Sequence, residues 1–376
     1  MKRILIILAA LAAAVPGFCC TSVIISGNVT YDGKPVMMKH RDTDQLNNRI
    51  ERFKGEKYDF IALVNSDWRT NPLSKYGKKG EAWTGVNSAG FSIMNTATYD
   101  LKDDEVPTEE MDREGILMYR ALGICSTLKE FEHFLDTLSR PMGVEANFGV
   151  IYAHGGAADY EVNNHKWVKF DVNEEESGYR VVTNFTQTGR PEDRRGEDRY
   201  AKASVLMKNI GTYVNTSFIK GRVIKRKITH KDLINKISRS GSPILRNITS
   251  ACLVIEGVKD GDNPLQTVMW TALGWPATTV YVPVMVMNED HIPYYLKYSS
   301  GSINAVMCDN ALKMKDKDVV NKCIEIERVI DRRFESIFTR WTSGLLSYNR
   351  FCSLYDSICR KYYEVYQEKF TDYLSL

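Results

Sequence analysis

Cys20 is the residue best placed to do chemistry, because the segment before it is typical of one that is removed on export. Two basic residues, an apolar run at residues 4–15 and a Pro-Gly-Phe sequence precede Cys19 and Cys20. This pattern predicts a secretory signal peptide over residues 1–19, with cleavage between Cys19 and Cys20. A lipid anchor is disfavoured, because Phe18 stands where a lipoprotein signal needs a small residue. We therefore expect an exported protein, periplasmic or extracellular.

Cleavage at that bond would leave a thiol and a free α-amine on the same residue. A thiol must lose its proton to become a nucleophile, and its ordinary pKa is about 8.5. An α-amine with a pKa of roughly 8 can accept that proton, directly or through a water molecule, and return it to the leaving group. Cys20 therefore needs no histidine base, and the six histidines of the chain form no convincing catalytic set.

The composition of the 376-residue chain is globular, with 43% hydrophobic and 26% charged residues. Fifty Lys and Arg face 47 Asp and Glu, and removal of residues 1–19 changes the net charge from +3 to 3 − 2 = +1. So near-neutral a balance gives no case for a nucleic-acid partner. No segment has about eighteen uninterrupted apolar residues, so no integral membrane span is expected.

Eight cysteines are present, and six remain when Cys19 and Cys20 are set aside. Six cysteines are compatible with disulfides in an oxidising compartment, and equally with buried small hydrophobic residues. No pair of cysteines has the spacing of a zinc site, and the sequence predicts no metal and no other cofactor.

The elements that must position Cys20 are mainly strands, interrupted by two groups of helices. The segments 21–29 and 35–39 flank Asp32-Gly33 and predict a hairpin. Further strands are predicted at residues 59–65, 81–86, 91–96, 148–154, 158–162, 166–171, 180–183, 251–257, 267–272 and 278–286. Pro283, in the last of these, predicts an edge or end position. Helices are predicted at residues 109–124, 128–138, from 190 to about 209, and over 319–373 with a break at 341–344. One compact domain over residues 20–376 is the simplest organisation, with 313–376 as a mainly helical extension.

The start of the predicted mature chain resembles a known family. Cys20-Thr21-Ser22, an apolar strand, a Tyr-Asp-Gly turn and then Arg41-Asp42-Thr43-Asp44 resemble the opening of N-terminal nucleophile (Ntn) hydrolases. The branch is that of choloylglycine hydrolase, penicillin acylase and acyl-CoA:6-aminopenicillanic acid acyltransferase. The resemblance implies that Arg41 and Asp44 are site residues. A guanidinium near the sulfur would favour the thiolate, and the carboxylate would hold the α-ammonium group. At the position of Asp42 the family usually has Asn.

Three later segments extend the resemblance and imply three further site residues. Residues 85–95 resemble a turn and strand that end in an oxyanion-hole residue, here Asn95, and residues 181–184 resemble a second such element ending in Asn184. Loss of one oxyanion-hole donor typically raises the barrier by about 3 to 4 kcal/mol. Residues 197–201 resemble a helix start at which the family has an arginine, here Arg199. We expect Arg199 to brace the site by pairing with a carboxylate.

The order and separation of these residues carry the resemblance more than any single one does. The separations are 21 residues from Cys20 to Arg41, 3 to Asp44, 51 to Asn95, 89 to Asn184 and 15 to Arg199. The match covers about residues 20–290. It implies an α+β protein with the four-layer αββα sandwich of the Ntn hydrolases.

The activity implied is that of an exported cysteine-dependent amidase, which cleaves a non-peptide linear C–N bond through a thioester on Cys20. The expected partner is a small-molecule amide, such as an N-acyl amine or a bile-salt-like or penicillin-like compound. Three alternatives remain open: a dipeptidase of the related Cys-starting branch, an acyltransferase to an amine acceptor, and a non-enzymatic lipid-anchored binding protein. The sequence also leaves open the acyl and amine parts of the substrate and the oligomeric state, a homo-oligomer included.

Overall fold

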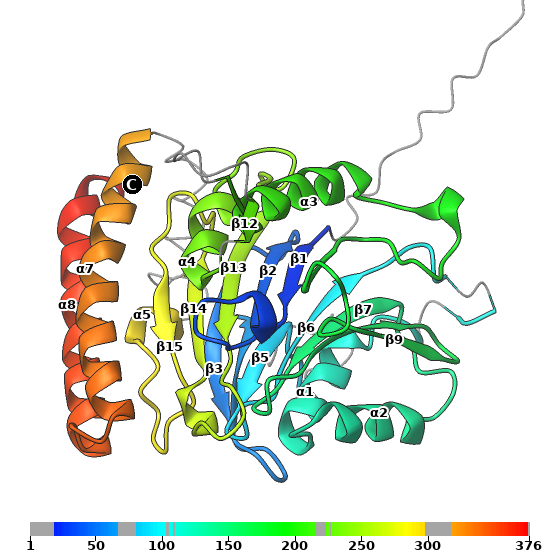
Figure 1. Cartoon of the computed structure of the whole chain (residues 1–376), viewed down its shortest axis with the longest axis horizontal. Coiled ribbons are helices and arrows are strands. Elements are labelled where there is room, and N and C mark those ends of the chain that lie inside the picture. The colour runs from blue at the N-terminus through cyan, green and yellow to red at the C-terminus, as the bar shows by residue number, and fades with distance from the viewer. Residues whose placement is uncertain are drawn as a thin grey trace, which may run out of the picture.

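The computed structural model describes residues 19–66, 80–102, 105–107, 110–214, 223–225, 227–297 and 317–374. Residues 1–18 of the predicted signal peptide and all of residues 298–316, Cys308 included, therefore lie outside the described part. The described elements form two large antiparallel sheets with helices outside them (Figure 1). No helix among the described residues is both long and apolar enough to cross a bilayer.

The six-stranded sheet carries the predicted N-terminal hairpin at its centre. Its strands, in spatial order, are β10 (Tyr179–Val182), β1 (Thr21–Ile25), β2 (Val36–Asp42), β13 (Thr249–Glu256), β14 (Val268–Leu273) and β15 (Val282–Val284). Every residue of β1 and β2 is buried, since both faces of these central strands are covered. Pro283 lies in the edge strand β15, as predicted, where its missing N–H breaks no ladder.

The seven-stranded sheet is a meander in which the spatial order of the strands follows the chain. Its strands are β3 (Asn48–Phe53), β4 (Phe60–Asn65), β5 (Thr84–Asn87), β6 (Ser92–Ala97), β7 (Ala146–Ile151), β8 (Ala157–Val162) and β9 (Trp167–Asp171). The prediction from the sequence omitted β3. A separate two-stranded ladder joins β11 (Thr212–Val214) to β12 (Val223–Lys225).

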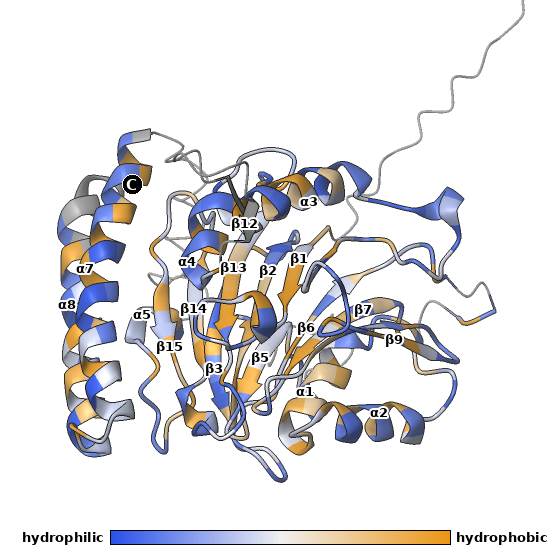
Figure 2. Ribbon diagram, in the orientation of Figure 1, coloured by the Kyte–Doolittle hydropathy of each residue, from blue (hydrophilic) through white to orange (hydrophobic). Residues whose placement is uncertain are grey.

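The two sheets pack face to face, with β1 and β2 of one against β7 and β8 of the other. The helices α1 (Glu114–Ile124) and α2 (Leu128–Thr137) bury Leu122 and Phe131 against the outer face of the seven-stranded sheet. On the outer face of the six-stranded sheet lie α3 (Glu197–Gly211), the single turn α4 (His230–Asp232) and the π-helical η4 (Leu233–Ser238). Apolar strands between amphipathic outer helices are visible in Figure 2. The predicted α+β αββα sandwich is confirmed by this layer order.

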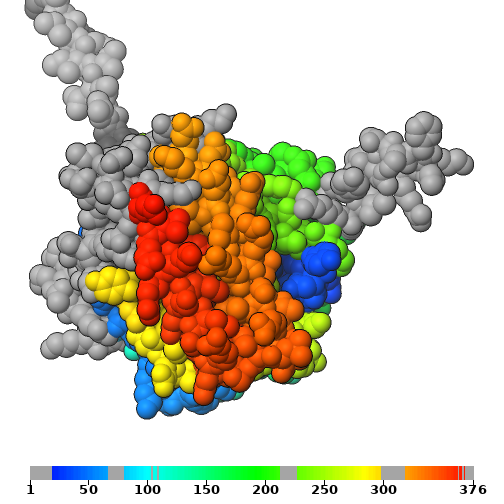
Figure 3. All heavy atoms as spheres, turned by 90° about the vertical axis from the view of Figure 1, so that its left-hand side faces the viewer, coloured from blue at the N-terminus to red at the C-terminus, as the bar shows by residue number. Residues whose placement is uncertain are grey.

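Two long C-terminal helices, α7 (Lys317–Thr342) and α8 (Tyr348–Leu374), lie side by side along the β15 edge (Figure 3). They break where predicted, at Gly344, whose φ of +75° favours glycine. The ring of Phe334 on α7 lies 5.6 Å from that of Trp270 on β14. Arg239, just after η4, forms a buried ion pair with Glu327 on α7 at 2.6 Å. The helical extension is thus continuous with the core of the sandwich.

Short helices complete the described chain: η1 (Gly27–Val29), η3 (Pro191–Asp193), η5 (Pro264–Gln266) and α5 (Tyr294–Lys297). The described cysteines beyond Cys20 are buried: Cys125, Cys252, Cys323, Cys352 and Cys359. No disulfide joins any two of the described cysteines, which pack among the hydrophobic side chains. Cys308 lies outside the described residues.

Candidate active site

Cys20 lies at the buried end of a central strand. It directly precedes β1, and only 6% of its surface is exposed. Thr21 and Ser22 of β1 pair with His40 and Lys39 of β2. The same register, continued by one residue, brings Arg41 opposite Cys20. Because side chains alternate along a strand, Lys39 and Arg41 share one face of β2 and His40 lies on the other.

Arg41 is held in place by neutral partners. Its Nη2 donates to Asn65 Oδ1 at 2.7 Å, its Nη1 donates to Asn48 Oδ1, and its guanidinium lies 5.0 Å from the centre of the Trp83 ring. Burial lowers the pKa of Arg41 to about 10, and the negative charges of a Cys20 thiolate, Glu81 and Asp44 oppose that shift. Arg41 thus keeps its charge at neutral pH and supplies a fixed cation beside Cys20.

Arg199 forms hydrogen bonds to both Cys20, the predicted nucleophile, and Asn184, one of the two predicted oxyanion-hole residues. It lies in the first turn of α3 and is 3% exposed. Its Nη1 donates to the carbonyl oxygen of Cys20 and to Thr21 Oγ1 at 3.2 Å, while Nη2 donates to Asn184 Oδ1 at 2.6 Å. Gly196 allows this packing, since a Cβ there would collide with the guanidinium. The expected carboxylate partner of Arg199 was wrong: the guanidinium binds carbonyl, hydroxyl and amide oxygens instead.

The carboxamide of Asn184 has a defined orientation. Its oxygen accepts from Arg199, and its Nδ2 donates to the carbonyl oxygen of Ala97 at 2.6 Å. Since Arg199 has no acceptor, the oxygen must face it, and the NH₂ group must face away. Asn184 is fully buried, just after β10, the neighbour of β1.

Asn95, on β6 of the other sheet, is fixed in a similar way by a lysine. Lys39 Nζ donates to Asn95 Oδ1 at 2.6 Å and to the carbonyl oxygen of Trp83 at 2.7 Å. Burial lowers the pKa of Lys39 to about 8; the charge of a Cys20 thiolate opposes this shift and that of Arg41 adds to it. Each of the two asparagines, Asn95 and Asn184, thus has its amide oxygen bound by a cation.

Asp44 lies at the rim of this arrangement. It is exposed, its Oδ1 accepts from Thr43 Oγ1 at 3.3 Å, and its charge acts on Arg41. While Cys19 precedes Cys20, the nitrogen of Cys20 belongs to a peptide bond, so the role of Asp44 toward an α-ammonium stays a prediction. Asp42 accepts from Thr249 Oγ1 at 2.6 Å, and burial raises its pKa to about 7.

Sequence reasoning missed three residues of this region: Lys39, Trp83 and Tyr99. Burial raises the pKa of Tyr99 above its ordinary value of 10, and charges on Cys19 and Cys20 add to the shift, which places this half-buried phenol near the thiols. The spacing of Lys39 two residues before Arg41 was the one available signal, since it puts both side chains on one face of the strand.

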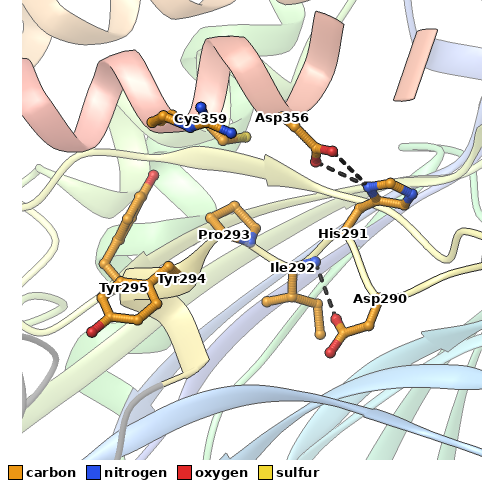
Figure 4. A pocket seen from close by; sticks show the side chains of 9 residues that line it. Asp290, His291, Ile292, Pro293, Tyr294, Tyr295, Asp356 and Cys359 are labelled. Carbon is orange, nitrogen blue, oxygen red and sulfur yellow. Dashed lines mark hydrogen bonds and ion pairs between the residues drawn. The ribbon is translucent and has the colours of Figure 1, made fainter. Parts of the chain in front are cut away.

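A separate cavity of about 360 Å³ lies between residues 290–295 and α8 (Figure 4). Its lining includes His291, whose Nδ1 lies 3.0 Å from Asp356 Oδ1, and it shares no residue with the Cys20 region. Among the described residues, no group of three or more His, Cys, Asp or Glu side chains could hold a metal ion.

Comparisons with known proteins find similarity only at the level of solved structures. No family model and no curated protein matches the chain. The chain is similar to an N-acylethanolamine-hydrolyzing acid amidase ortholog from Caenorhabditis elegans, at 15% identity and a TM-score of 0.45, over 65% of this chain and 93% of that one. It is also similar to a mutant of conjugated bile acid hydrolase from Clostridium perfringens, at 11% identity and 0.42, over 74% and 94% of the two chains. A third is penicillin V acylase from Agrobacterium tumefaciens, at 15% and 0.40, over 72% and 87%.

Proposed function

We propose that this chain is the precursor of an exported cysteine-dependent amidase of the Ntn hydrolase type, in which Cys20 attacks a linear, non-peptide amide. The observation that carries this proposal is the convergence of Arg41, Asn184 and Arg199 on the buried Cys20 end of β1. These residues are distant in sequence, and the resemblance to the Ntn hydrolases implies a site role for each of them. The expected substrate is a small N-acyl amine or a similar amide.

The proposed reaction begins with proton transfer from the thiol of Cys20 to its own α-amine, freed by cleavage after Cys19. The sulfur then attacks the amide carbonyl, and the new C–S bond pushes the carbonyl electrons onto oxygen. Collapse of this tetrahedral intermediate breaks the C–N bond, and the amine leaves with the proton from the α-ammonium group. Water, deprotonated by the same α-amine, hydrolyses the thioester and regenerates Cys20.

The protein contributes charge and orientation to these steps. Arg41 stabilises the thiolate, and the NH₂ groups of Asn95 and Asn184 are candidate donors to the oxyanion. Because the oxygens of both amides are bound by cations, little reorientation is needed when the oxyanion forms.

The test is to secrete the full chain, determine the mature N-terminus by mass spectrometry, and screen chromogenic amides that differ in acyl chain. We expect an unmodified Cys20 as the first residue and release of the chromophore from at least one amide. Cys20→Ser should reduce turnover by roughly a thousandfold or more while the thermal unfolding midpoint stays close to that of the wild type.

Three results would contradict the proposal. An acylated Cys20 would favour a lipid-anchored binding protein, a mature chain that starts elsewhere would remove the base, and full activity of Cys20→Ser would remove the nucleophile. Free amino acids released from dipeptides would point to the dipeptidase branch. Chromophore release that requires an added amine acceptor, with the acyl group recovered on that amine and little free acid formed, would indicate acyl transfer.

A further inference from the structure

Lys39 is a buried lysine that connects the two sheets next to Cys20. It lies on β2, opposite Ser22 of β1, and only 2% of its surface is exposed. Both of its hydrogen-bond acceptors belong to the facing sheet or its margin: Asn95 Oδ1 on β6 and the carbonyl oxygen of Trp83, directly before β5. Neither acceptor carries a charge.

The electrostatic surroundings of Lys39 lack a permanent anion. Among the described residues, no carboxylate lies within ion-pair distance of Nζ. The charged or titratable groups that act on it are Cys20, at the start of β1, and Arg41, two residues further along β2. A buried ammonium group is costly unless it is paired. Of the two groups that act on Lys39, Cys20 is the one that can become an anion.

If Lys39 had only the structural role of joining the two sheets, its hydrogen bonds to the two neutral acceptors would be sufficient. The position of Lys39 does more than this, because the same ammonium group acts on the nucleophile and holds the oxygen of an amide singled out as an oxyanion-hole donor. With its oxygen on Lys39, Asn95 turns its NH₂ group away from the lysine.

Resting on the function proposed above, we propose that Lys39 is a positioning residue for the reaction at Cys20. Its ammonium group stabilises the Cys20 thiolate and fixes the carboxamide of Asn95 in the orientation that an oxyanion needs. Lys39 thus acts through Cys20 and Asn95 and forms no bond to the substrate.

The first test measures the thiolate directly and needs no substrate, so it stays informative if the proposed amidase activity fails. Alkylation of Cys20 by iodoacetamide is followed by mass spectrometry between pH 6 and 10, for the mature wild type, Lys39→Gln, Lys39→Met and Lys39→Arg. Gln keeps a donor for Asn95 but carries no charge, and Met lacks both. We expect Gln and Met to slow alkylation at pH 7 by about tenfold or more, and Arg to restore the rate to within about threefold.

Lys34→Met is the matched control, because Lys34 lies on the same hairpin but pairs with Glu256 at 3.1 Å. In this variant Cys20 should be alkylated at the wild-type rate. Urea unfolding identifies any variant that fails to fold. If Lys39→Gln or Lys39→Met does so, the alkylation rate of the other tests the thiolate role. A folded neutral variant that alkylates at the wild-type rate across the pH range would overturn the thiolate role.

The second test is a double-mutant cycle on amide turnover. If Lys39 acts partly through Asn95, Lys39→Met should lower kcat by a smaller factor in the Asn95→Ala background than in the wild type. Equal factors in both backgrounds would overturn the positioning of Asn95. A wild type that turns over no amide would instead count against the proposed function, and the alkylation result would still judge Lys39.

Discussion

Substitution of Arg199 by Met is expected to damage both stability and catalysis. The guanidinium serves three buried oxygens: the carbonyl of Cys20, Thr21 Oγ1 and Asn184 Oδ1. A hydrogen bond to a charged group contributes about 1.5 to 3 kcal/mol, and Met offers no donor to replace any of them. Relief from burying the cation offsets part of this loss, so the free energy of unfolding should fall by about 3 to 5 kcal/mol.

The catalytic effect of the same substitution follows from Asn184. Without Arg199, the amide oxygen of Asn184 loses the cation that binds it, and the hydrogen bond from Nδ2 to the carbonyl oxygen of Ala97 holds the carboxamide less firmly. An NH₂ group that has moved no longer donates to the oxyanion. Loss of one such donor lowers kcat by about 10² to 10³. The assays are urea unfolding, followed by tryptophan fluorescence, and turnover of whichever amide the screen identifies.

Arg194→Met provides the control for these measurements. Arg194 precedes α3, and among the described residues its side chain donates to the carbonyl oxygen of Thr186 at 3.4 Å and lies over the ring of Phe185. Its loss should change stability by less than about 1 kcal/mol and leave turnover unchanged. If Arg199→Met unfolded at the wild-type midpoint and kept the wild-type kcat, the bracing role assigned to Arg199 would be refuted.

Three further predictions concern the N-terminus, a buried carboxyl group and the C-terminal helices. A mature chain with one Ala before Cys20 should be inactive, because the base becomes an amide nitrogen; activity would count against the mechanism once mass spectrometry excludes self-removal of the Ala. Burial raises the pKa of Asp42 from 3.8 to about 7, so the folded chain keeps a proton that the unfolded chain loses, and this stabilisation disappears as the pH rises from about 4 to 7. Asp42→Asn should remove this pH dependence of the free energy of unfolding. At about 1.4 kcal/mol per pKa unit, the dependence reaches up to about 4 kcal/mol between pH 4 and 8. If plots of the free energy of unfolding against pH were parallel for the wild type and the variant, the explanation would be wrong. Arg239→Met should cost about 3 to 5 kcal/mol by leaving Glu327 buried and unpaired, and the double variant with Glu327→Met should recover much of the loss in urea unfolding. A double variant as unstable as the single one would contradict the ion-pair explanation.

The parts of the site that the sequence predicted are those fixed by local signals. Asp32-Gly33 marks the reversal between β1 and β2, and Gly33 has the positive φ of +82° that such a turn requires. Glu197 and Asp198 open α3 with negative charge at its N-terminus, which places Arg199 in the first turn. These signals need only a few neighbouring residues, so they can be recognised without the fold.

The parts that the sequence did not predict depend on contacts between distant segments. The strand β3 has half-buried charged residues, and its Arg49 and Glu51 pair at 2.7 Å, so no apolar alternation indicated a strand. A lysine in a strand usually faces solvent, and Lys39 is buried only because the second sheet covers it. Likewise the neutral partners of Arg199 come from two segments that are distant in sequence, the start of β1 and the residues just after β10.

Among the described residues, every hydrogen bond at the Cys20 end of β1 is made by atoms that follow the bond between Cys19 and Cys20 in the chain. Arg199 donates to the carbonyl oxygen of Cys20 and to the hydroxyl oxygen of Thr21, and both belong to the part of the chain that would remain after export. Hydrolysis of that one bond would therefore expose the amine without rearranging the groups around it. On the proposed mechanism, the described groups that hold Cys20 all belong to the part of the chain that remains after export, so the mature protein can assemble this end of β1 without its leader.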